Sequence, residues 1–191
     1  MTDVTIFGSG NMGTAIAELA RKGGATVTHV GSGDTTARVS GDLVVLAVPH
    51  PALDVIVDTY GDQLAGRTVV DITNPLDFST FDDLVVRGDS SKASELAAAL
   101  PGARVLKAFN TNFAATLGSG QVGDQPTTVL VAGDDADAKQ TLIDLVTAAG
   151  LQAVDAGSLK RARELEALGF LQLTLAAGEK LGWTGGFALV R

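Results

Sequence analysis

The sequence predicts an α/β protein with a Rossmann-like, doubly wound and mainly parallel sheet. Helices are expected on both faces, followed by a short C-terminal helical extension. Three observations predict this fold. Apolar β-type stretches alternate with amphipathic helical stretches along the chain, and several of the strands are unbroken apolar runs, which is typical of buried parallel strands. A glycine-rich turn, residues 8–13, lies between the first strand and the first helix.

The individual elements follow from these patterns. Strands are expected at residues 3–8, 25–31, 43–48, 67–72, 104–109, 127–132 and 152–155. Helices are expected at residues 11–22, 51–64, 91–100, 135–149 and 160–182. Residues 76–92 and 112–126 are expected to be loops. Residues 32–41 are too few for an ordinary crossover helix, so that helix is predicted to be missing or a single turn.

The chain of 191 residues suits one domain with a small appendage. We expect residues 1–159 to form a dinucleotide-binding Rossmann domain. Residues 160–191 are expected to form a C-terminal helix and tail packed on the same domain.

Composition narrows the possible functions. The chain has no cysteine, which excludes disulfides and thiolate metal sites, and its two histidines form no metal-ligand pattern with carboxylates, so no metal site is expected. A net charge of -8 disfavours nucleic acid and anionic membranes as partners. No stretch of 18 apolar residues is present, so neither a membrane span nor a signal peptide is expected. A cytoplasmic location fits these features.

The glycine run is the strongest functional signal. It reads Gly8-Ser9-Gly10-Asn11-Met12-Gly13, a GxGxxG pattern between a strand and an amphipathic helix. In this context the first glycine makes the turn, the second lets a pyrophosphate approach and the third lets the helix pack closely. We therefore predict that all six residues bind a dinucleotide; the alternative is a glycine-rich turn of another α/β protein.

The end of the second strand bears on the choice of dinucleotide. NAD sites usually place a carboxylate there, but Gly31 and Ser32 occupy the tip. Ser32 and the turn N–H groups could bind a 2′-phosphate, with Arg38 as the nearest cation. This favours NADP, whereas Asp34 favours NAD, and Arg38 could equally be a solvated loop charge.

Two further strand ends are candidates for cofactor contacts. Open α/β sheets bind ligands outside the carboxyl ends of their strands. Ala47, Val48, Pro49 and His50 end the third strand, where they could flank the nicotinamide ribose; His50 could donate a proton, or could simply be exposed. Asn74 and Pro75 follow the fourth strand, where Asn74 could bond the carboxamide or merely form a turn.

Candidate acceptor contacts follow the fifth strand and lie in the tail. Phe109 beside Asn110 could form the floor of an acceptor site, although Phe109 could also be core. Lys107 could orient an anionic group or pair with Asp71. Trp183, the only tryptophan, could cover the pocket or pack the chain end.

No catalytic acid or nucleophile stands out. Neither a Ser/His/Asp nor a Cys/His constellation is present, and His50 is the only weak candidate for a proton donor. Hydride transfer between two bound rings needs little protein acid–base chemistry, because the cofactors carry the reaction. A carbonyl substrate would need a positioned proton donor. The sequence therefore fits a deazaflavin or flavin acceptor.

The last predicted helix is apolar over a wide arc. Its apolar residues include Leu165, Leu168, Leu171 and Leu175, spread over more than the ~100° stripe of a helix with one buried face. Some of this surface could face a second subunit, as in a homodimer. The alternative is deep burial within one chain.

Seven segments carry a resemblance to a known family. The chain resembles the short Rossmann oxidoreductases typified by NADPH-dependent reductases of the deazaflavin coenzyme F-420, and it is similar to the cytosolic domain of the STEAP metalloreductases. The matching segments are residues 8–13, 31–32, 47–49, 105–110, 131–135, 154–157 and 161–166.

The resemblance implies a homodimeric NADP enzyme that moves a hydride to a planar acceptor. Its phosphate-binding serine corresponds to Ser32, whereas Gly33 stands where the family often has arginine. The expected activity is hydride transfer between NADPH and the deazaflavin, which would be a dissociable co-substrate. Two alternatives stay open: a flavin or ferric reductase, and a dinucleotide-sensing module without turnover.

Overall fold

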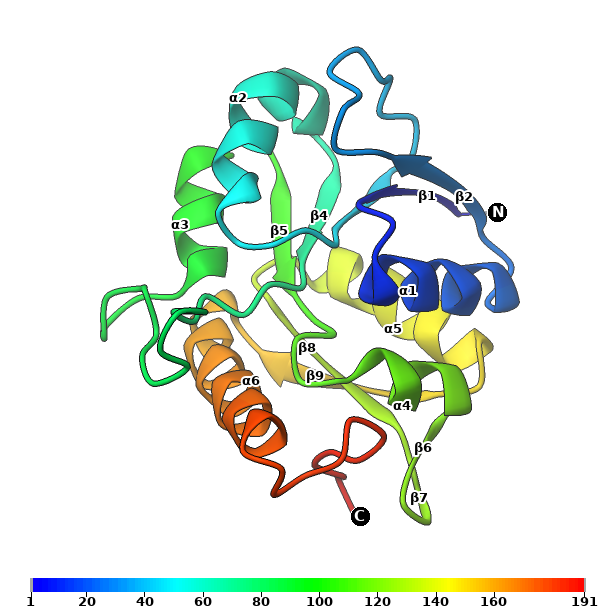
Figure 1. Cartoon of the computed structure of the whole chain (residues 1–191). Helices are drawn as coiled ribbons and strands as arrows, with labels where there is room; N and C mark the ends of the chain where they lie inside the picture. Colours follow the sequence, from blue (N-terminus) through cyan, green and yellow to red (C-terminus); the bar gives the residue numbers. More distant parts are fainter. Residues whose placement is uncertain (1, 191) are drawn as a thin grey trace.

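The computed structural model describes residues 2–190 and is built around one seven-stranded sheet (Figure 1). Its strand order is β2-β1-β3-β4-β5-β8-β9, and every neighbouring pair is parallel except β5 and β8. The strands are β1 (Asp3–Phe7), β2 (Thr26–Val30), β3 (Leu43–Leu46), β4 (Thr68–Asp71), β5 (Arg104–Lys107), β8 (Thr128–Gly133) and β9 (Gln152–Gly157).

Because β8 runs antiparallel to β5, the carboxyl ends of the strands lie at two opposite edges of the sheet. The carboxyl ends of β1, β3, β4 and β5 lie together at what we call the site edge. The carboxyl ends of β8 and β9 point to the opposite edge.

Helices cover both faces of the sheet. They are α1 (Asn11–Lys22), α2 (Ala52–Leu64), α3 (Lys92–Ala99), α4 (Ala114–Ser119), α5 (Ala136–Ala148) and α6 (Ala162–Ala177). One core cluster joins the sheet to α1, α4 and α5, through residues such as Ile16, Leu117 and Leu142. The other joins it to α2 and α3, through Leu53 and Leu96. The predicted fold class is confirmed.

The structure differs from the predicted elements in two places. Residues 112–126, expected to be a loop, contain α4 and a small hairpin of β6 (Gln121–Val122) and β7 (Gln125–Pro126). Elements of two to six residues are too short to show a hydrophobic period. The helix predicted at residues 160–182 begins with a 3-10 turn, Leu159–Arg161, and α6 ends at Ala177, before Gly178. The link at residues 32–41 contains no helix, as expected.

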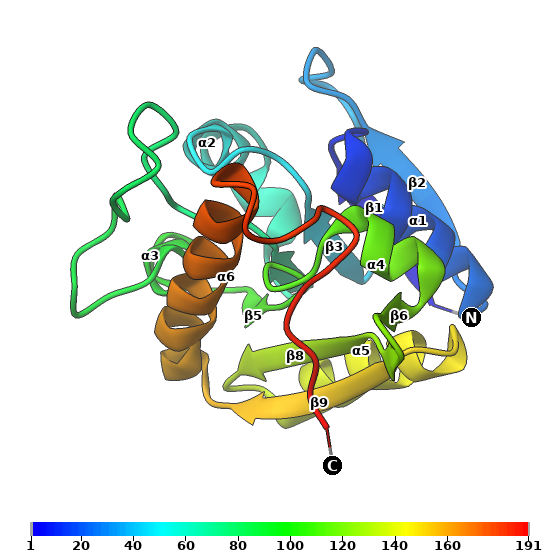
Figure 2. The same cartoon turned by 60° about the horizontal axis from the view of Figure 1, so that its bottom comes forward.

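After α6 the chain crosses back over the molecule. Figure 2 shows this tail passing α4 and then β8 and β9. The backbone N–H of Phe187 donates to Oε1 of the buried Gln172 at 3.2 Å, so the tail is tied to α6. The division predicted at residue 159 stays a prediction. Among residues 2–190, no helix is long and apolar enough to cross a membrane.

Candidate functional site

The glycine turn between β1 and α1 is shaped by two close approaches. Gly8 has a φ of +99°, and a Cβ at this position would lie 2.2 Å from the carbonyl oxygen of Ala47. A Cβ on Gly13 would lie 2.5 Å from the carbonyl oxygen of Gly8. Gly10 differs, because its Cβ would meet no heavy atom within 4 Å. Glycine is therefore required at the turn and at the helix contact, and the space in front of Gly10 is open.

The N-terminus of α1 is open to an anion. Its N-cap, Gly10, supplies no side-chain hydrogen bond, and its first turn has no acidic residue. A helix that begins this way presents free N–H groups and the positive end of its dipole. These features fit the pyrophosphate of a dinucleotide, which would be held by residues 8–13. Contact with a dinucleotide stays a prediction for each of these residues.

A hollow of about 180 Å³ adjoins the turn, between the end of β2 and α2. Ser32 and Asp34 line it together with apolar side chains. The Tyr60 hydroxyl donates to the carbonyl of Asp34, and the Asp34 carboxylate accepts the N–H of Thr36 at 3.0 Å. Arg38 is exposed and is not among the lining residues. The hollow has the position and the apolar character expected of an adenine site, and we call it the adenine-side hollow.

The end of β3 lies against the glycine turn. The N–H of Ala47 donates to the carbonyl of Phe7 at 2.9 Å, and Val48 lines the adenine-side hollow. The ring of His50 stacks on Phe78 with centroids 6.1 Å apart and planes 13° apart. His50 therefore sits beside the loop that follows β4.

A larger pocket, of about 370 Å³, lies at the site edge beside the N-terminus of α1. We call it the aromatic pocket. Its apolar wall comes from Met12, Phe109, Phe113, Leu173 and Trp183. The rings of Phe113 and Trp183 are in contact, with centroids 5.0 Å apart. The pocket thus offers flat apolar surfaces next to the predicted dinucleotide site.

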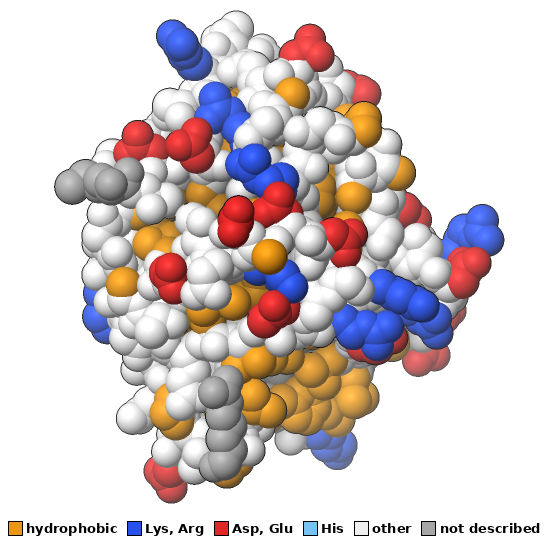
Figure 3. All heavy atoms as spheres, turned by 180° about the vertical axis from the view of Figure 1, so that it is seen from behind, with side chains coloured by type: hydrophobic (Ala, Val, Ile, Leu, Met, Phe, Trp, Pro, Cys, Tyr) orange, Lys and Arg blue, Asp and Glu red, His pale blue; other side chains and the backbone are white. Residues whose placement is uncertain are grey.

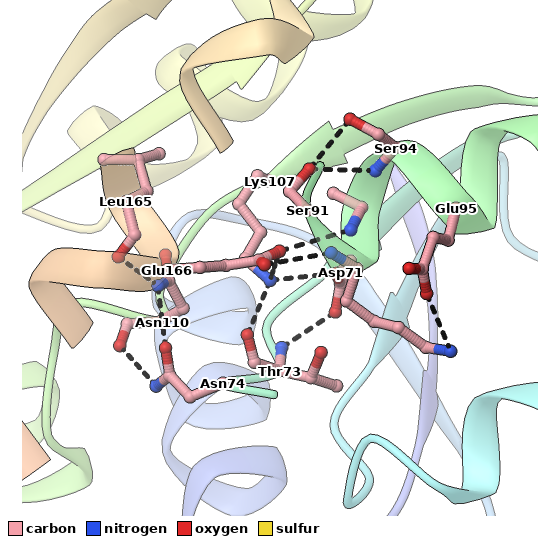
Figure 4. Close-up of polar contacts among 12 residues, drawn as sticks. Asp71, Thr73, Asn74, Ser91, Ser94, Glu95, Lys107, Asn110, Leu165 and Glu166 are labelled. Atoms are coloured by element: carbon pink, nitrogen blue, oxygen red, sulfur yellow. Dashed lines mark hydrogen bonds and ion pairs between the residues drawn. The ribbon is translucent and has the colours of Figure 1, made fainter. Parts of the chain in front are cut away.

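Four asparagines line this pocket: Asn11, which is exposed, and Asn74, Asn110 and Asn112 at the ends of β4 and β5. Asn74 Nδ2 donates to the backbone oxygen of Asn110 at 2.8 Å, and Asn110 Nδ2 donates to Asn74 Oδ1 at 2.9 Å (Figure 4). Asn110 Nδ2 also donates to the carbonyl of Leu165 in α6 at 2.8 Å. The two amides therefore form a clasp that joins the ends of β4 and β5 to α6.

Gly169 allows α6 to reach this clasp. A Cβ there would lie 2.2 Å from Asn74 Oδ1 and 2.9 Å from Asn110 Nδ2. Any larger residue would push the helix away from the strand ends.

Phe109 has an uncommon backbone conformation. Its φ is +62°, although it is a bulky residue and almost fully buried. Such conformations cost about 1–3 kcal/mol and persist where the surroundings impose them, often at functional sites. Phe109 is one of the residues that line the aromatic pocket.

Lys107 is buried beneath the pocket and does not line it. Its Nζ lies 2.9 Å from Asp71 Oδ2 and 2.9 Å from Glu166 Oε1, and all three side chains are almost inaccessible to water (Figure 4). The sequence predicted two possible roles for Lys107, and one of them, an ion pair with Asp71, is present. A contact between Lys107 and a substrate stays an untested prediction.

Glu166 connects this buried cluster to α3. Its carboxylate accepts the backbone N–H of Lys92 at 2.9 Å and of Ala93 at 3.2 Å. Burial raises the pKa of Glu166; Lys107 and the N–H of Lys92 act in the opposite direction, and Asp71 adds to the rise. The carboxylate thus fixes α6 to the N-terminus of α3 at an electrostatic cost.

The fold brings together only part of the predicted site. Asn11, Met12, Asn74, Phe109, Asn110 and Trp183 line the aromatic pocket. Gly8, Ser32 and Val48 line the adenine-side hollow. Arg38, Pro49, His50, Pro75 and Lys107 line neither. Among residues 2–190, no group of three His, Asp or Glu side chains is arranged to hold a metal ion.

Several lining residues were not predicted. Asn112 could have been found from its position in the amide-rich stretch after β5. Phe113, Leu173 and Tyr60 carry no such signal, because an isolated apolar or aromatic residue in a helix or loop is more often core.

The chain is similar to several known proteins. The chain is 29% identical over 174 residues to the F-420-dependent NADP reductase of Methanocaldococcus jannaschii, covering 88% of this chain and 77% of that protein. It is 38% identical over 110 residues to metalloreductase STEAP3 of Rattus norvegicus. The chain covers only 21% of STEAP3, about a fifth of its length. No protein-family model matches the chain.

Solved structures agree on the fold. A protein from Arthrobacter sp. FB24 described as an F-420-dependent NADP reductase matches with a TM-score of 0.87 at 24% identity, over 100% of both chains. A hypothetical protein from Sinorhizobium meliloti matches with a TM-score of 0.69 at 27% identity, over 83% of this chain and 86% of that one.

The fold and the glycine turn define a Rossmann-like α/β protein, and the two curated relatives are named as reductases, which is consistent with an oxidoreductase. Within that class, the predicted resemblance to the F-420-dependent NADP reductases is confirmed, together with the similarity to STEAP3.

Proposed function

We propose that the protein transfers a hydride between NADPH and a planar acceptor bound in the aromatic pocket, and that this acceptor is the deazaflavin coenzyme F-420. The observation that carries the proposal is the position of this pocket: it shares Asn11 and Met12 with the glycine turn. A ring in the pocket would therefore be adjacent to a dinucleotide bound at α1.

The chain's own contribution is binding and orientation. The bound nicotinamide supplies the hydride, and the deazaflavin accepts it. Residues 8–13 would hold the pyrophosphate, and Val48 would face the adenine half. The residues that would flank the nicotinamide half are Ala47, Pro49, His50, Asn74 and Pro75. Phe109, Phe113 and Trp183 would hold the acceptor ring and keep water away from it.

The apolar wall of the pocket supports a ring-to-ring transfer. The described residues that line it include no lysine, arginine, histidine or carboxylate that could protonate a carbonyl substrate. A hydride moved directly between two bound rings does not need such a group.

The choice between NADP and NAD depends on Ser32 and Asp34 in this proposal. Ser32 would meet a 2′-phosphate, with Arg38 as a nearby cation. The Asp34 carboxylate already accepts an N–H of its own loop, which draws it into a turn. Replacing Ser32 by Asp should weaken NADPH binding much more than NADH binding. An equal loss for both dinucleotides would contradict the role of Ser32.

The main proposal is tested by following NADPH oxidation with oxidised deazaflavin coenzyme, with NADH as the parallel donor. Bleaching of the deazaflavin band that depends on NADPH supports both donor and acceptor. Tight NADPH binding with turnover of free flavin or ferric complexes instead would favour the second candidate, which the similarity to STEAP3 suggests. Tight binding without turnover of any acceptor would favour a dinucleotide-sensing module.

We also propose that the chain forms a homodimer through α6 and the tail. Eight large hydrophobic side chains are exposed among residues 2–190, and five of them lie here: Leu171, Trp183, Phe187, Leu189 and Val190. Figure 3 shows apolar side chains gathered at the lower edge of the molecule, in the region of α6. Light scattering of the native chain and of Leu171→Arg tests this: a dimer that the substitution dissociates supports it, and a native monomer overturns it.

A further inference from the structure

Three buried polar atoms have no hydrogen-bond partner among the described residues, and all three lie at the site edge. They are Thr73 Oγ1, Asn110 Oδ1 and Asn112 Oδ1. Thr73 follows β4, and the two asparagines follow β5. Buried polar side chains are nearly always hydrogen-bonded, so a cluster of exceptions needs an explanation. Two of the three side chains, Asn110 and Asn112, also line the aromatic pocket.

The neighbours of these asparagines fix which amide atom is free. Asn110 Nδ2 faces two acceptors, Asn74 Oδ1 and the carbonyl of Leu165. Asn112 Nδ2 donates to the carbonyl of Thr128 at 3.0 Å. Turning either amide over would place an oxygen against an oxygen, so the orientation with nitrogen toward these partners is required. Asn110 is therefore left with a free acceptor and no free donor, whereas Asn112 keeps a free acceptor and the second hydrogen of its amide nitrogen.

Asn74 has a partner for both its amide nitrogen and its amide oxygen. Asn74 donates through Nδ2 to the backbone oxygen of Asn110 and accepts through Oδ1 from Asn110. Among these three amides, the atoms that are buried without any partner are the oxygens of Asn110 and Asn112. Flat apolar surfaces from Phe109, Phe113 and Trp183 surround these acceptors.

We infer that Asn110 and Asn112 select a planar ring whose edge carries an amide-type N–H donor. The inference rests on the proposed function and specifies the ligand chemistry of the same pocket. Two parts of the proposed reactants carry such a group: the carboxamide of nicotinamide and the imide N–H of a flavin or deazaflavin ring. A quinone, which presents only acceptors, would face two unpaired oxygens and be rejected.

Paired ligands test this selection and distinguish its two sources. One pair is NADPH and its 3-acetylpyridine analogue, in which an acetyl group replaces the carboxamide and no N–H remains. The other pair is riboflavin and riboflavin methylated at its imide nitrogen. Trp183 is the only tryptophan and lines the pocket, so quenching of its fluorescence reports binding of each ligand.

We expect one pair to differ in dissociation constant by about 10-fold or more, as a lost hydrogen bond to a buried site requires. A difference in the first pair assigns the donor to the carboxamide, and one in the second pair assigns it to the acceptor ring. Asn112→Ala removes one free oxygen and should reduce that difference. The control is Gln140→Ala, which removes an exposed amide on α5 outside the pocket and should keep it.

The native chain alone can overturn the inference, even if Asn112→Ala does not fold. Binding of both parent ligands with no difference in either pair would leave the proposed function intact and refute the selection by N–H donors. A full difference retained in a folded Asn112→Ala variant would refute the role of Asn112. If neither NADPH nor riboflavin binds, the proposed function fails and this inference fails with it.

Discussion

The two edges of the sheet use the same kind of junction, in which a strand leads through a short turn into a helix, but they satisfy their polar groups differently. At the site edge, β1 leads into α1, whose N-terminus has no side-chain cap. At the opposite edge, β8 leads into α5, where Asp135 accepts the N–H of Ala138 at 2.8 Å and Asp137 adds a second carboxylate. The N-terminus of α5 is thus occupied by its own chain, and that of α1 is left for an anion.

Ion pairs show the same contrast. Near the N-terminus of α5, Lys139 pairs with Asp155 at 2.8 Å, and the Asp155 side chain is half exposed. At the site edge, Lys107, Asp71 and Glu166 form a fully buried cluster. All the buried side-chain atoms without a partner in the described part of the chain also lie at the site edge. The polar groups that the chain leaves without a hydrogen-bond partner therefore lie at the edge where a ligand is expected.

The largest effect should come from a charge placed at the open helix end. Gly10→Asp puts a carboxylate where a pyrophosphate would bind, and we expect NADPH affinity to fall about 100-fold or more, which corresponds to about 2.7 kcal/mol. Isothermal titration calorimetry measures it. The matched control, Ala136→Asp, adds the same charge at the start of α5 and should leave NADPH affinity unchanged. Equal losses of NADPH affinity in both variants would show that the N-terminus of α1 is no more sensitive to an added charge than that of α5.

The next effect concerns the amide clasp. Gly169→Ala forces a methyl group against Asn74 Oδ1, which would lie 2.2 Å away. We expect the free energy of unfolding to fall by about 1–3 kcal/mol, as is usual for overpacking. Urea denaturation measures the change. Gly118→Ala in α4 is the control, because a Cβ there meets no heavy atom within 4 Å and should not destabilise the chain. Unchanged stability in Gly169→Ala would show that α6 does not depend on this contact.

A smaller effect is expected at the opposite edge. Asp135→Ala removes the cap of α5 and should cost about 1 kcal/mol of unfolding free energy. NADPH affinity should stay the same, because α5 starts at the other edge of the sheet. Thermal unfolding and a binding titration on the same sample measure both. Weaker NADPH binding without a change in stability would contradict the separation of the two edges.

These differences explain how much could be predicted from the sequence. Periodicity and glycine spacing predict the sheet, the crossovers and the turn at Gly8–Gly13, because these depend on residues close together in the chain. The missing helix at residues 32–41 follows from length alone. The short α4 and the hairpin before β8 have too few residues to show a period, so they were missed.

The site itself is less predictable, because it depends on contacts between distant segments. Asn74 and Asn110 are 36 residues apart, and nothing local says that their amides meet. From its position at a strand end, Lys107 is predicted to contact the hydride acceptor. In the structure it forms a buried ion pair with Glu166 of α6. The free oxygens of Asn110 and Asn112 follow only from knowing where their nitrogens are used.

The smallest effect is a difference in pH dependence between the two edges. The pKa of Glu166 is raised by burial above its ordinary value of 4.5, whereas the pKa of Asp155 is lowered by Lys139 below its ordinary value of 3.8. A raised carboxyl pKa means that the folded chain holds the proton more tightly than the unfolded chain. The contribution of Glu166 to stability is therefore fully present below pH 4.5 and is lost as the pH rises through its folded pKa.

Asp155 has the opposite sign: its contribution is present above pH 3.8 and is lost as the pH falls through its folded pKa. Urea denaturation at a series of pH values separates the two. Glu166→Gln should remove a decline in unfolding free energy above pH 4.5, and Asp155→Asn should remove a decline below pH 3.8. If Glu166→Gln keeps the native slope above pH 4.5, the buried cluster does not hold this carboxylate at an electrostatic cost.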